Sequence, residues 1–253
     1  MRVLFVSDEV APFTNRSELA PLVRSLPEML HENQGVETRI LMPRYGIVSE
    51  RRNRLHEVIR LSGAEIKTGD GTEALKVKVA SIPGIRLQVY FMDNVHMFKR
   101  KGIFADKAGK TFADNPERAI FFAKSVIKTI ANLGWQPDVV HSFGWLSGMI
   151  PHLLKTDYAE HPLFADAKVV YTPQAVEFKG PLTEKMVGDF DLSEGDRLVG
   201  KEPSEIGSDF ADATIHLPSH ETSNGTEQFG DDAEANMNVA SSVYERVQSG
   251  VPA

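Results

Sequence analysis

The chain has 253 residues, of which 42% are hydrophobic and 25% are charged, a composition typical of a soluble globular protein with a sizeable core. Its 28 basic and 35 acidic residues give a formal net charge of -7, which argues against a nucleic-acid partner because phosphate neutralisation requires a concentrated basic surface. The absence of cysteine excludes disulfides and cysteine nucleophiles. No apolar run approaches the ~20 residues of a membrane helix. We therefore expect a soluble, cytoplasmic protein without membrane association.

The first forty residues predict a βαβ unit. The continuous apolar run Val3–Val6 is typical of a strand that is covered on both faces, as in a parallel sheet. Residues 17–35 then carry apolar side chains at helical spacing up to Gly35, and residues 36–43 form a second strand that ends at Pro43. This order predicts a right-handed crossover and two parallel strands.

Residues 73–93 have a different pattern. Apolar and charged side chains alternate on both sides of Pro83-Gly84, which is typical of a half-exposed β-hairpin. We expect this hairpin to be appended to the main sheet and its open edge to be a candidate contact surface.

The remaining elements alternate between helices and strands. Asn115 is the expected N-cap of a helix that begins at Pro116 and ends before Gly134. Residues 176–207 are polar and are expected to form a surface loop with one short helix. The other elements that we expect are a locally basic, solvated loop at 99–110, a strand at 138–142, a helix at 145–155, buried strands at 168–172 and 211–219, and a last helix with a tail at 233–253. The pattern predicts an α/β fold, with one doubly wound Rossmann-like domain over residues 1–253 and the hairpin as an insertion.

His141 and Trp145 lie at the carboxyl end of a predicted strand, within the segment Pro137–Gly148. Open α/β folds bind ligands at this edge of the sheet, so both residues are candidates for a site. A histidine at a strand end is also commonly hydrogen-bonded to a neighbouring loop, and this alternative stays open.

Two motifs for binding phosphate are incomplete. The first strand-to-helix loop contains no glycine, so it lacks the G-x-G-x-x-G pattern of dinucleotide-binding folds. Gly195–Glu202 matches G-x-x-x-x-G-K, but Glu202 stands where a phosphate loop has Ser or Thr, and Pro203 is expected to interrupt a following helix. We therefore expect neither a dinucleotide cofactor nor a phosphate loop.

Two metal-like motifs are also incomplete. Residues 189–193 imitate a calcium loop that lacks its glycine and its closing glutamate. His216 and His220 are four residues apart and Glu221 follows them, but Pro218 breaks the helix that would bring the two histidines together. We expect no metal, no cofactor and, without a G-x-S-x-G motif, no hydrolase of that type.

Several stretches together resemble the amino-terminal domain of bacterial glycogen and starch synthases, glycosyltransferases that lengthen α-1,4-glucan from ADP-glucose. They follow the family's order from Arg2 to about Thr172 and read RVLFVSDEVAPF, LVRSLPEML, MPRYG, FKRKGIFADKAGKTFADNPERAIFF, PDVVHSFGWLSGMIPHLLK and KVVYT. The resemblance implies one Rossmann-like half of a GT-B fold, with ADP-glucose or α-glucan as ligand in a cleft that a second domain, not contained in this sequence, would complete. The residues that it implies for substrate binding are Glu9, Arg16, Tyr45, His141, Trp145 and Gly148.

Three positions depart from the family's pattern together. Asn15 replaces the lysine of a Lys-Thr-Gly-Gly-Leu loop that serves the donor's phosphates, Gly144 replaces an aspartate, and Gln174 replaces a histidine. Side chains also replace the two glycines of that loop, and they block the approach of the backbone to a phosphate.

These departures predict a catalytically impaired or inactive chain that acts as a scaffold for a glucan or a protein partner. We expect a partner or a second copy of the chain to cover the exposed cleft. An active glycosyltransferase subunit that a second chain completes, and an α/β protein that binds an unrelated small ligand, stay open as alternatives.

Overall fold

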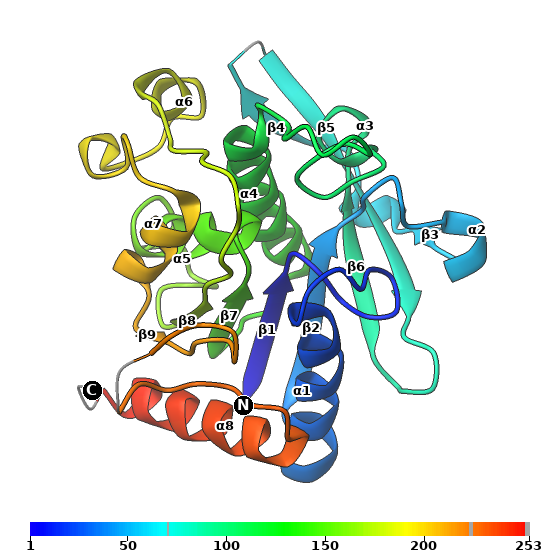
Figure 1. The fold of residues 1–253 in the computed structure, drawn as a ribbon, viewed down its shortest axis with the longest axis vertical. Helices are drawn as coiled ribbons and strands as arrows, with labels where there is room; N and C mark the ends of the chain where they lie inside the picture. The colour runs from blue at the N-terminus through cyan, green and yellow to red at the C-terminus, as the bar shows by residue number, and fades with distance from the viewer. Residues whose placement is uncertain (70, 223–224, 251–253) are drawn as a thin grey trace.

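The structure is a computed structural model that describes residues 1–69, 71–222 and 225–250. The strands of this part are β1 (Arg2–Ser7), β2 (Glu37–Pro43), β3 (His56–Glu57), β4 (Ala64–Thr68), β5 (Gly71–Ser81), β6 (Gln88–Asp93), β7 (Val139–Phe143), β8 (Lys168–Thr172) and β9 (Ala213–Thr214). They form one mixed sheet in the order β3-β5-β6-β2-β1-β7-β8-β9, and β4 pairs with β5 beside this path (Figure 1).

The middle of the sheet is parallel, as predicted. β1 pairs in parallel with β2 on one side and with β7 on the other, so that Phe5 lies between Ile40 and His141. β8 continues the parallel set beyond β7. All of β7, and all of β1 except Arg2, is buried, which explains the continuous apolar runs in the sequence.

Helices cover both faces of this sheet. They are α1 (Leu19–Gln34), α2 (Glu50–Asn53), α3 (Val95–Phe98), α4 (Asn115–Leu133), α5 (Met149–Lys155), α6 (Glu184–Asp189), α7 (Pro203–Phe210) and α8 (Ala233–Ser249), with 3₁₀ turns η1 (Ile59–Leu61), η2 (Leu146–Gly148) and η3 (Gly195–Arg197). α1 packs against α8 on one face, and α4 packs against α5 on the other (Figure 1). Right-handed crossovers explain why α1 and α5 lie on opposite faces of the sheet. α1 leads from β1 to β2 in one direction across the sheet, and α5 leads from β7 to β8 in the other direction. Within the described residues, no helix is both long and apolar enough to cross a membrane.

The predicted hairpin forms, but it is not an appendage. β5 and β6 pair in antiparallel fashion, with Ser81 opposite Gln88. β6 also pairs in parallel with β2, where Val89 lies opposite Ile40, so it is an inner strand of the main sheet. The outer edge of β5 pairs with β3 and β4. The expectation of an open hairpin edge is therefore wrong, because the segment between β2 and β5 folds back to cover it.

The ends of the two long helices lie close to their predicted positions. Gly35 and Gly134 have φ angles of 67° and 68° and end α1 and α4 in the left-handed conformation. The N-cap of α4 is Asp114 and not Asn115. Asn115 is the first helical residue, and its Nδ2 donates a hydrogen bond to the carbonyl oxygen of Phe104 at 2.9 Å. This contact ties the start of α4 to the loop before it.

The last third of the described chain contains more helix and less strand than expected. Residues 176–207 include α6, η3 and the start of α7, where one short helix was expected. The strand expected at 211–219 is only β9, which pairs with β8 over two residues before the chain leaves the sheet. α8 forms as predicted, and residues 251–253 of the expected tail lie outside the described residues.

Candidate functional site

Three loops meet at the carboxyl edge of the parallel strands. β1 runs into Asp8 and Glu9, β7 runs into Gly144, and β8 runs into Pro173 and Gln174. The three strands are neighbours in the sheet, so these ends lie side by side. Open α/β folds bind their ligands at this edge.

Asp8 is buried at this edge and holds the loop between β7 and η2. Its carboxylate accepts hydrogen bonds from the backbone N–H groups of Leu146 at 2.8 Å and Ser147 at 2.9 Å, and from the Ser147 hydroxyl at 2.7 Å. Burial raises the pKa of Asp8 to about 7, although these hydrogen bonds act in the opposite direction. We did not predict a role for Asp8 from the sequence, where its one signal is an acidic residue placed directly after a buried strand.

Gly144 lies against Asp8. Its φ angle is 98°, and a Cβ atom on it would lie 2.5 Å from the Cγ of Asp8. The N–H of Gly144 donates to the carbonyl oxygen of Thr172 at 2.9 Å, and its own carbonyl accepts from the Tyr171 hydroxyl at 2.9 Å. The backbone at this position is therefore fixed from both sides, and it leaves no room for a side chain.

His141 lies in the core beneath the edge. Its Nδ1 is 2.7 Å from the hydroxyl oxygen of Tyr244, and its Nε2 is 2.9 Å from the Oγ1 of Thr172. Its ring stacks on Phe143 with 3.8 Å between the ring centroids. Burial lowers the pKa of His141 well below its usual value, so the ring is neutral. This geometry is that of a hydrogen-bonded structural histidine.

Trp145 and Gly148 are buried as well. The Nε1 of Trp145 donates to the Oε2 of Glu202 at 3.2 Å. A Cβ atom on Gly148 would overlap the carbonyl oxygen of Pro203. Both residues pack the start of α5 against the start of α7, so they lie behind the edge of the sheet together with His141.

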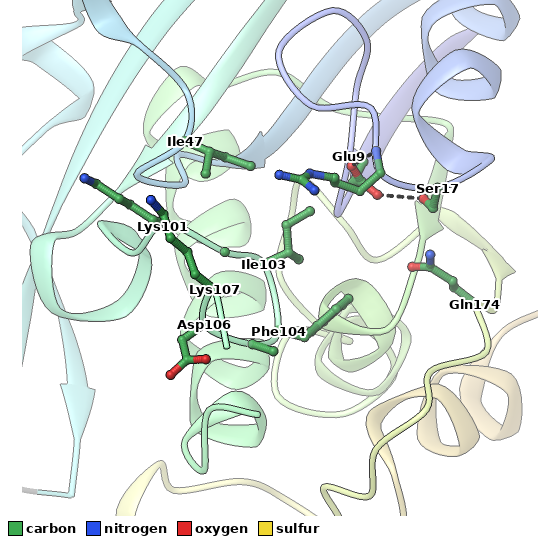
Figure 2. A pocket seen from close by; sticks show the side chains of 12 residues that line it. Glu9, Ser17, Ile47, Lys101, Ile103, Phe104, Asp106, Lys107 and Gln174 are labelled. Atoms are coloured by element: carbon green, nitrogen blue, oxygen red, sulfur yellow. Dashed lines mark hydrogen bonds between the residues drawn. The ribbon is translucent and has the colours of Figure 1, made fainter. Parts of the chain in front are cut away.

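A cleft of about 600 Å³ opens above this edge, between the β1–α1 loop (residues 8–18) and the loop at residues 101–107. Figure 2 shows side chains that line it: Glu9, Ser17 and Gln174 on one side, Lys101 and Lys107 on the other, and Ile103 and Phe104 between them. The expectation of a merely solvated loop at 99–110 is wrong for this part, because residues 101–107 form one wall of the cleft.

Glu9 and Arg16 come together in this cleft. The carboxylate of Glu9 accepts hydrogen bonds from the backbone N–H of Arg16 at 2.9 Å and from the Ser17 hydroxyl at 2.7 Å. Glu9 therefore closes the β1–α1 loop on itself. The side chain of Arg16 is exposed and lines the cleft, whereas Asn15 is exposed but does not line it.

Cations outnumber carboxylates in the cleft. Its charged side chains are Arg16, Lys101, Lys107, Glu9 and Asp106. This local positive excess contrasts with the net charge of -7 of the whole chain. The replacement at Asn15 therefore does not leave the cleft without a cation.

Gln174 enters the cleft from the end of β8, whereas Tyr45 lies beneath it. The Oε1 of Gln174 is buried and has no hydrogen-bond partner among the described residues, so its capacity as an acceptor is unused. Tyr45 is fully buried, with its ring edge-on to Phe98 at 6.3 Å between centroids. Burial raises the pKa of Tyr45 well above its usual value. Tyr45 therefore supports the cleft and does not line it.

A buried arginine fixes the wall of the cleft. The Nε of Arg118 donates to the carbonyl oxygen of Met97 at 2.7 Å, and its Nη1 donates to the carbonyl oxygen of Ile103 at 2.6 Å and to the Oδ1 of Asn115 at 2.5 Å. Burial lowers the pKa of Arg118 to about 10. The sequence signal that was missed is an arginine inside the strongly apolar first half of a helix.

A second cavity of about 600 Å³ lies on the other side of Gln174, beside α7. His216 and His220 line it with 4.7 Å between their ring centroids, although Pro218 separates them in the sequence. Burial, together with the neighbouring His220, lowers the pKa of His216. Nowhere in the described part of the chain do three His, Cys, Asp or Glu side chains gather in a way that could hold a metal ion.

The segment Gly195–Glu202 is not arranged as a phosphate loop. The Nζ of Lys201 forms an ion pair with the Oδ2 of Asp209 at 2.6 Å. The Glu202 carboxylate accepts from the N–H of Gly180 at 2.9 and 3.1 Å and takes part in a capping box at the start of α7. Pro203 is the first residue of α7, so the expectation that it interrupts a helix is wrong. Proline fits this position because the first helical residue requires no N–H donor.

Comparison with known proteins assigns the chain to a family. The family model for the starch synthase catalytic domain matches residues 2–215. The chain belongs to this family.

This starch synthase family member has curated relatives that are glycogen synthases. The glycogen synthase of Chlorobium limicola is 44% identical over 186 residues, which are 73% of this chain and 38% of the relative. The glycogen synthase of Chlorobaculum parvum is 42% identical over 186 residues, with the same two shares. The chain thus spans 38% of the length of these relatives.

A solved structure has the same fold. The catalytic domain of starch synthase IV from Arabidopsis thaliana, bound to ADP and acarbose, matches with a TM-score of 0.68 and 19% identity, over 84% of this chain and 44% of that chain. The predicted family and the predicted α/β class, a Rossmann-like half of the GT-B starch synthase fold, are both confirmed.

Proposed function

We propose that this starch synthase family member is a scaffold that binds an α-glucan, or a protein partner that covers the cleft, and that it is impaired in transferring glucose from ADP-glucose. The contact between Gly144 and Asp8 carries the proposal. The relatives of this chain that are named glycogen synthases support the choice of ligand class.

Positions 144 and 174 at the edge of the sheet lack groups that could support transfer. Gly144 has no charge and no space for a carboxylate, and the amide of Gln174 cannot act as a general acid or base. His141 is neutral and enclosed in the core. Removing one group that stabilises a transition-state charge commonly costs about 100-fold in rate, so two replacements reduce transfer severely.

The β1–α1 loop disfavours the phosphates of a sugar nucleotide. Ser17 and Glu18 stand where the family's pattern has two glycines. The Ser17 hydroxyl is bonded to Glu9, and the Glu18 carboxylate accepts a hydrogen bond from the Ser219 hydroxyl. Both side chains hold the loop in place and replace the open backbone that two glycines would give, so we expect weak donor binding.

The cleft suits a sugar better. Its volume of about 600 Å³ lies in the usual range for small-ligand sites. Phe104 supplies an apolar ring, and the unpaired Oε1 of Gln174 supplies an acceptor for a sugar hydroxyl. An apolar surface next to a few polar groups is the usual lining of a small-ligand site.

An active glycosyltransferase subunit is the second candidate. The three cations Arg16, Lys101 and Lys107 favour it, because they could neutralise the phosphates of a donor in place of the lysine that Asn15 replaces. In that case another part of the protein or another chain would complete the cleft.

Calorimetric titration of the chain with maltoheptaose and with ADP-glucose tests the proposal. We expect saturable binding of maltoheptaose, at least tenfold weaker binding to Gln174→Ala, and unchanged binding to the control Gln136→Ala, whose side chain is exposed and far along the chain from the cleft loops. Tight ADP-glucose binding would favour the second candidate. Binding of neither probe would contradict the α-glucan part of the proposal and leave a protein partner or an unrelated small ligand as the occupant of the cleft.

A further inference from the structure

An arginine-rich segment follows β2. Four of the ten residues from Arg51 to Arg60 are arginines, in a chain whose net charge is -7. The nearest carboxylate on the amino-terminal side, that of Glu50, forms ion pairs with Arg44 and with Lys78. Glu50 therefore does not neutralise the segment.

The other acid of this segment also points elsewhere. His56 and Glu57 are consecutive residues of β3, so their side chains lie on opposite faces. Glu57 lies 3.9 Å from the Nζ of Lys76. Within residues 1–69, 71–222 and 225–250, neither Arg52 nor Arg54 forms an ion pair at 4 Å or less.

These unpaired cations face a cavity. A hollow of about 530 Å³, here named the arginine cavity, lies between the α2–β3 segment, the end of β5 and the tip of the β1–α1 loop. The side chains that matter for its chemistry are Arg52, Arg54, His56, Ser81, Gln88 and Phe13. No carboxylate is among its described lining residues.

The local fold places the two arginines at the end of α2. Ser49 caps α2 by accepting a hydrogen bond from the N–H of Arg52 at 3.3 Å. Arg54 ends this helix with a φ angle of 52°, a left-handed conformation that glycine or asparagine adopts at lower cost. This strained backbone at Arg54 motivates the hypothesis that its side chain has a role.

A third basic group of the cavity comes from β3, and a fourth, Arg24, lies next to one of its lining residues. β3 pairs with β5 so that His56 lies opposite Val79, which lines the cavity. Arg24 of α1 donates from Nη2 to the carbonyl oxygen of Pro83 at 3.3 Å, and Pro83 also lines the cavity. Basic side chains from the end of α2 and from β3 therefore line this hollow, and Arg24 of α1 lies beside it.

We propose that the arginine cavity binds a hexose phosphate. The guanidinium groups of Arg52 and Arg54 hold the phosphate, because a planar guanidinium donates paired hydrogen bonds that match phosphate oxygens. Ser81 and Gln88 bond the sugar hydroxyls, and Phe13 packs against the apolar face of the sugar ring. The volume exceeds what an inorganic phosphate fills and is within the range of small-molecule sites. This site is separate from the cleft, whose lining residues it does not share.

Calorimetry on the full chain at physiological salt tests this site, with glucose 6-phosphate, inorganic phosphate and glucose as probes. We expect saturable binding of glucose 6-phosphate and at least tenfold weaker binding of the other two. The double variant Arg52→Gln/Arg54→Gln should lose at least tenfold in affinity for glucose 6-phosphate. The control Arg51→Gln/Arg60→Gln removes the same charge from exposed positions outside the cavity and should change affinity less than twofold.

Four outcomes would overturn the proposal. Absence of saturable binding of glucose 6-phosphate removes the site. Equal loss in both double variants means general charge attraction, and equal affinity for inorganic phosphate means that the sugar is not recognised. An equal loss in Arg16→Gln places the ligand in the cleft instead. Thermal melting of each variant checks that it is folded, and exposed arginines are expected to leave the melting temperature unchanged.

Discussion

The Cβ atom that any other residue would carry at position 144 would lie 2.5 Å from the Cγ of Asp8. Asp8 cannot move away easily, because its carboxylate accepts three hydrogen bonds from Leu146 and Ser147. The two residues therefore exclude a carboxylate at position 144, where the family's pattern has an aspartate.

Gly144→Asp is expected to destabilise the fold. The variant combines a left-handed backbone, a steric overlap and a second buried carboxyl, which together cost roughly 2–4 kcal/mol in free energy of unfolding. Chemical denaturation measures this cost. Gly188→Asp is the control, because its added Cβ meets no atom within 4 Å, and it should cost less than about 1 kcal/mol. Equal stabilities of the two variants would show that Asp8 and Gly144 are not locked together.

Asp8 is expected to make stability depend on pH. Its pKa rises from 3.8 in the unfolded chain to about 7 in the folded chain, so the folded state binds the extra proton between these values. The favourable contribution of the protonated carboxyl is complete below pH 3.8 and is lost as the pH rises through 7. Asp8→Asn should therefore gain stability relative to wild type as the pH rises from about 4 to about 7, by at most about 1.4 kcal/mol per pH unit. A difference that stays constant with pH would contradict the raised pKa.

Arg118→Met is expected to loosen the wall of the cleft. The variant leaves the carbonyl groups of Met97 and Ile103 without their buried donor, which costs about 3 kcal/mol or more. Hydrogen exchange at residues 97–104 should rise more than exchange in β1. Arg100→Gln is the control, because it removes a half-exposed ion pair with Asp114 and should cost at most about 1 kcal/mol. Unchanged exchange at this wall in Arg118→Met would refute the positioning role.

Tyr244→Phe is expected to weaken the docking of α8. The variant removes the 2.7 Å hydrogen bond between the Tyr244 hydroxyl and the Nδ1 of His141 and leaves a buried ring nitrogen unpaired, at a cost of about 1–3 kcal/mol. Tyr158→Phe removes a hydroxyl from a half-buried residue and serves as the control. Maltoheptaose affinity should stay the same in Tyr244→Phe, since His141 does not line the cleft. A loss of sugar affinity without a loss of stability would assign His141 to the site.

The sequence predicts what depends on local pattern. Apolar runs identify β1 and β7 because both faces of these strands are covered, and glycines identify the ends of α1 and α4 because only they adopt the left-handed cap easily. The order of strands and helices then predicts the carboxyl edge as the place of the site, and Glu9, Arg16 and Gln174 do lie there together.

The sequence does not predict what depends on contacts between distant segments. His141 is near the right edge, but its partners Thr172 and Tyr244 are 31 and 103 residues away, and they turn it into a core residue. The basic loop that contains Lys101 and Lys107 resembles any solvated loop until Arg118 fixes it against the cleft. From the sequence, Pro203 predicts a break in a helix, and only the structure shows that α7 begins at this residue.

Elongation of maltoheptaose from labelled ADP-glucose by the purified chain, alone and with added cell extract, measures directly whether the sheet edge around Gly144 still performs chemistry. We predict no incorporation of glucose above the background without the chain, and none above the extract alone. Sustained incorporation that depends on the chain would contradict the scaffold proposal.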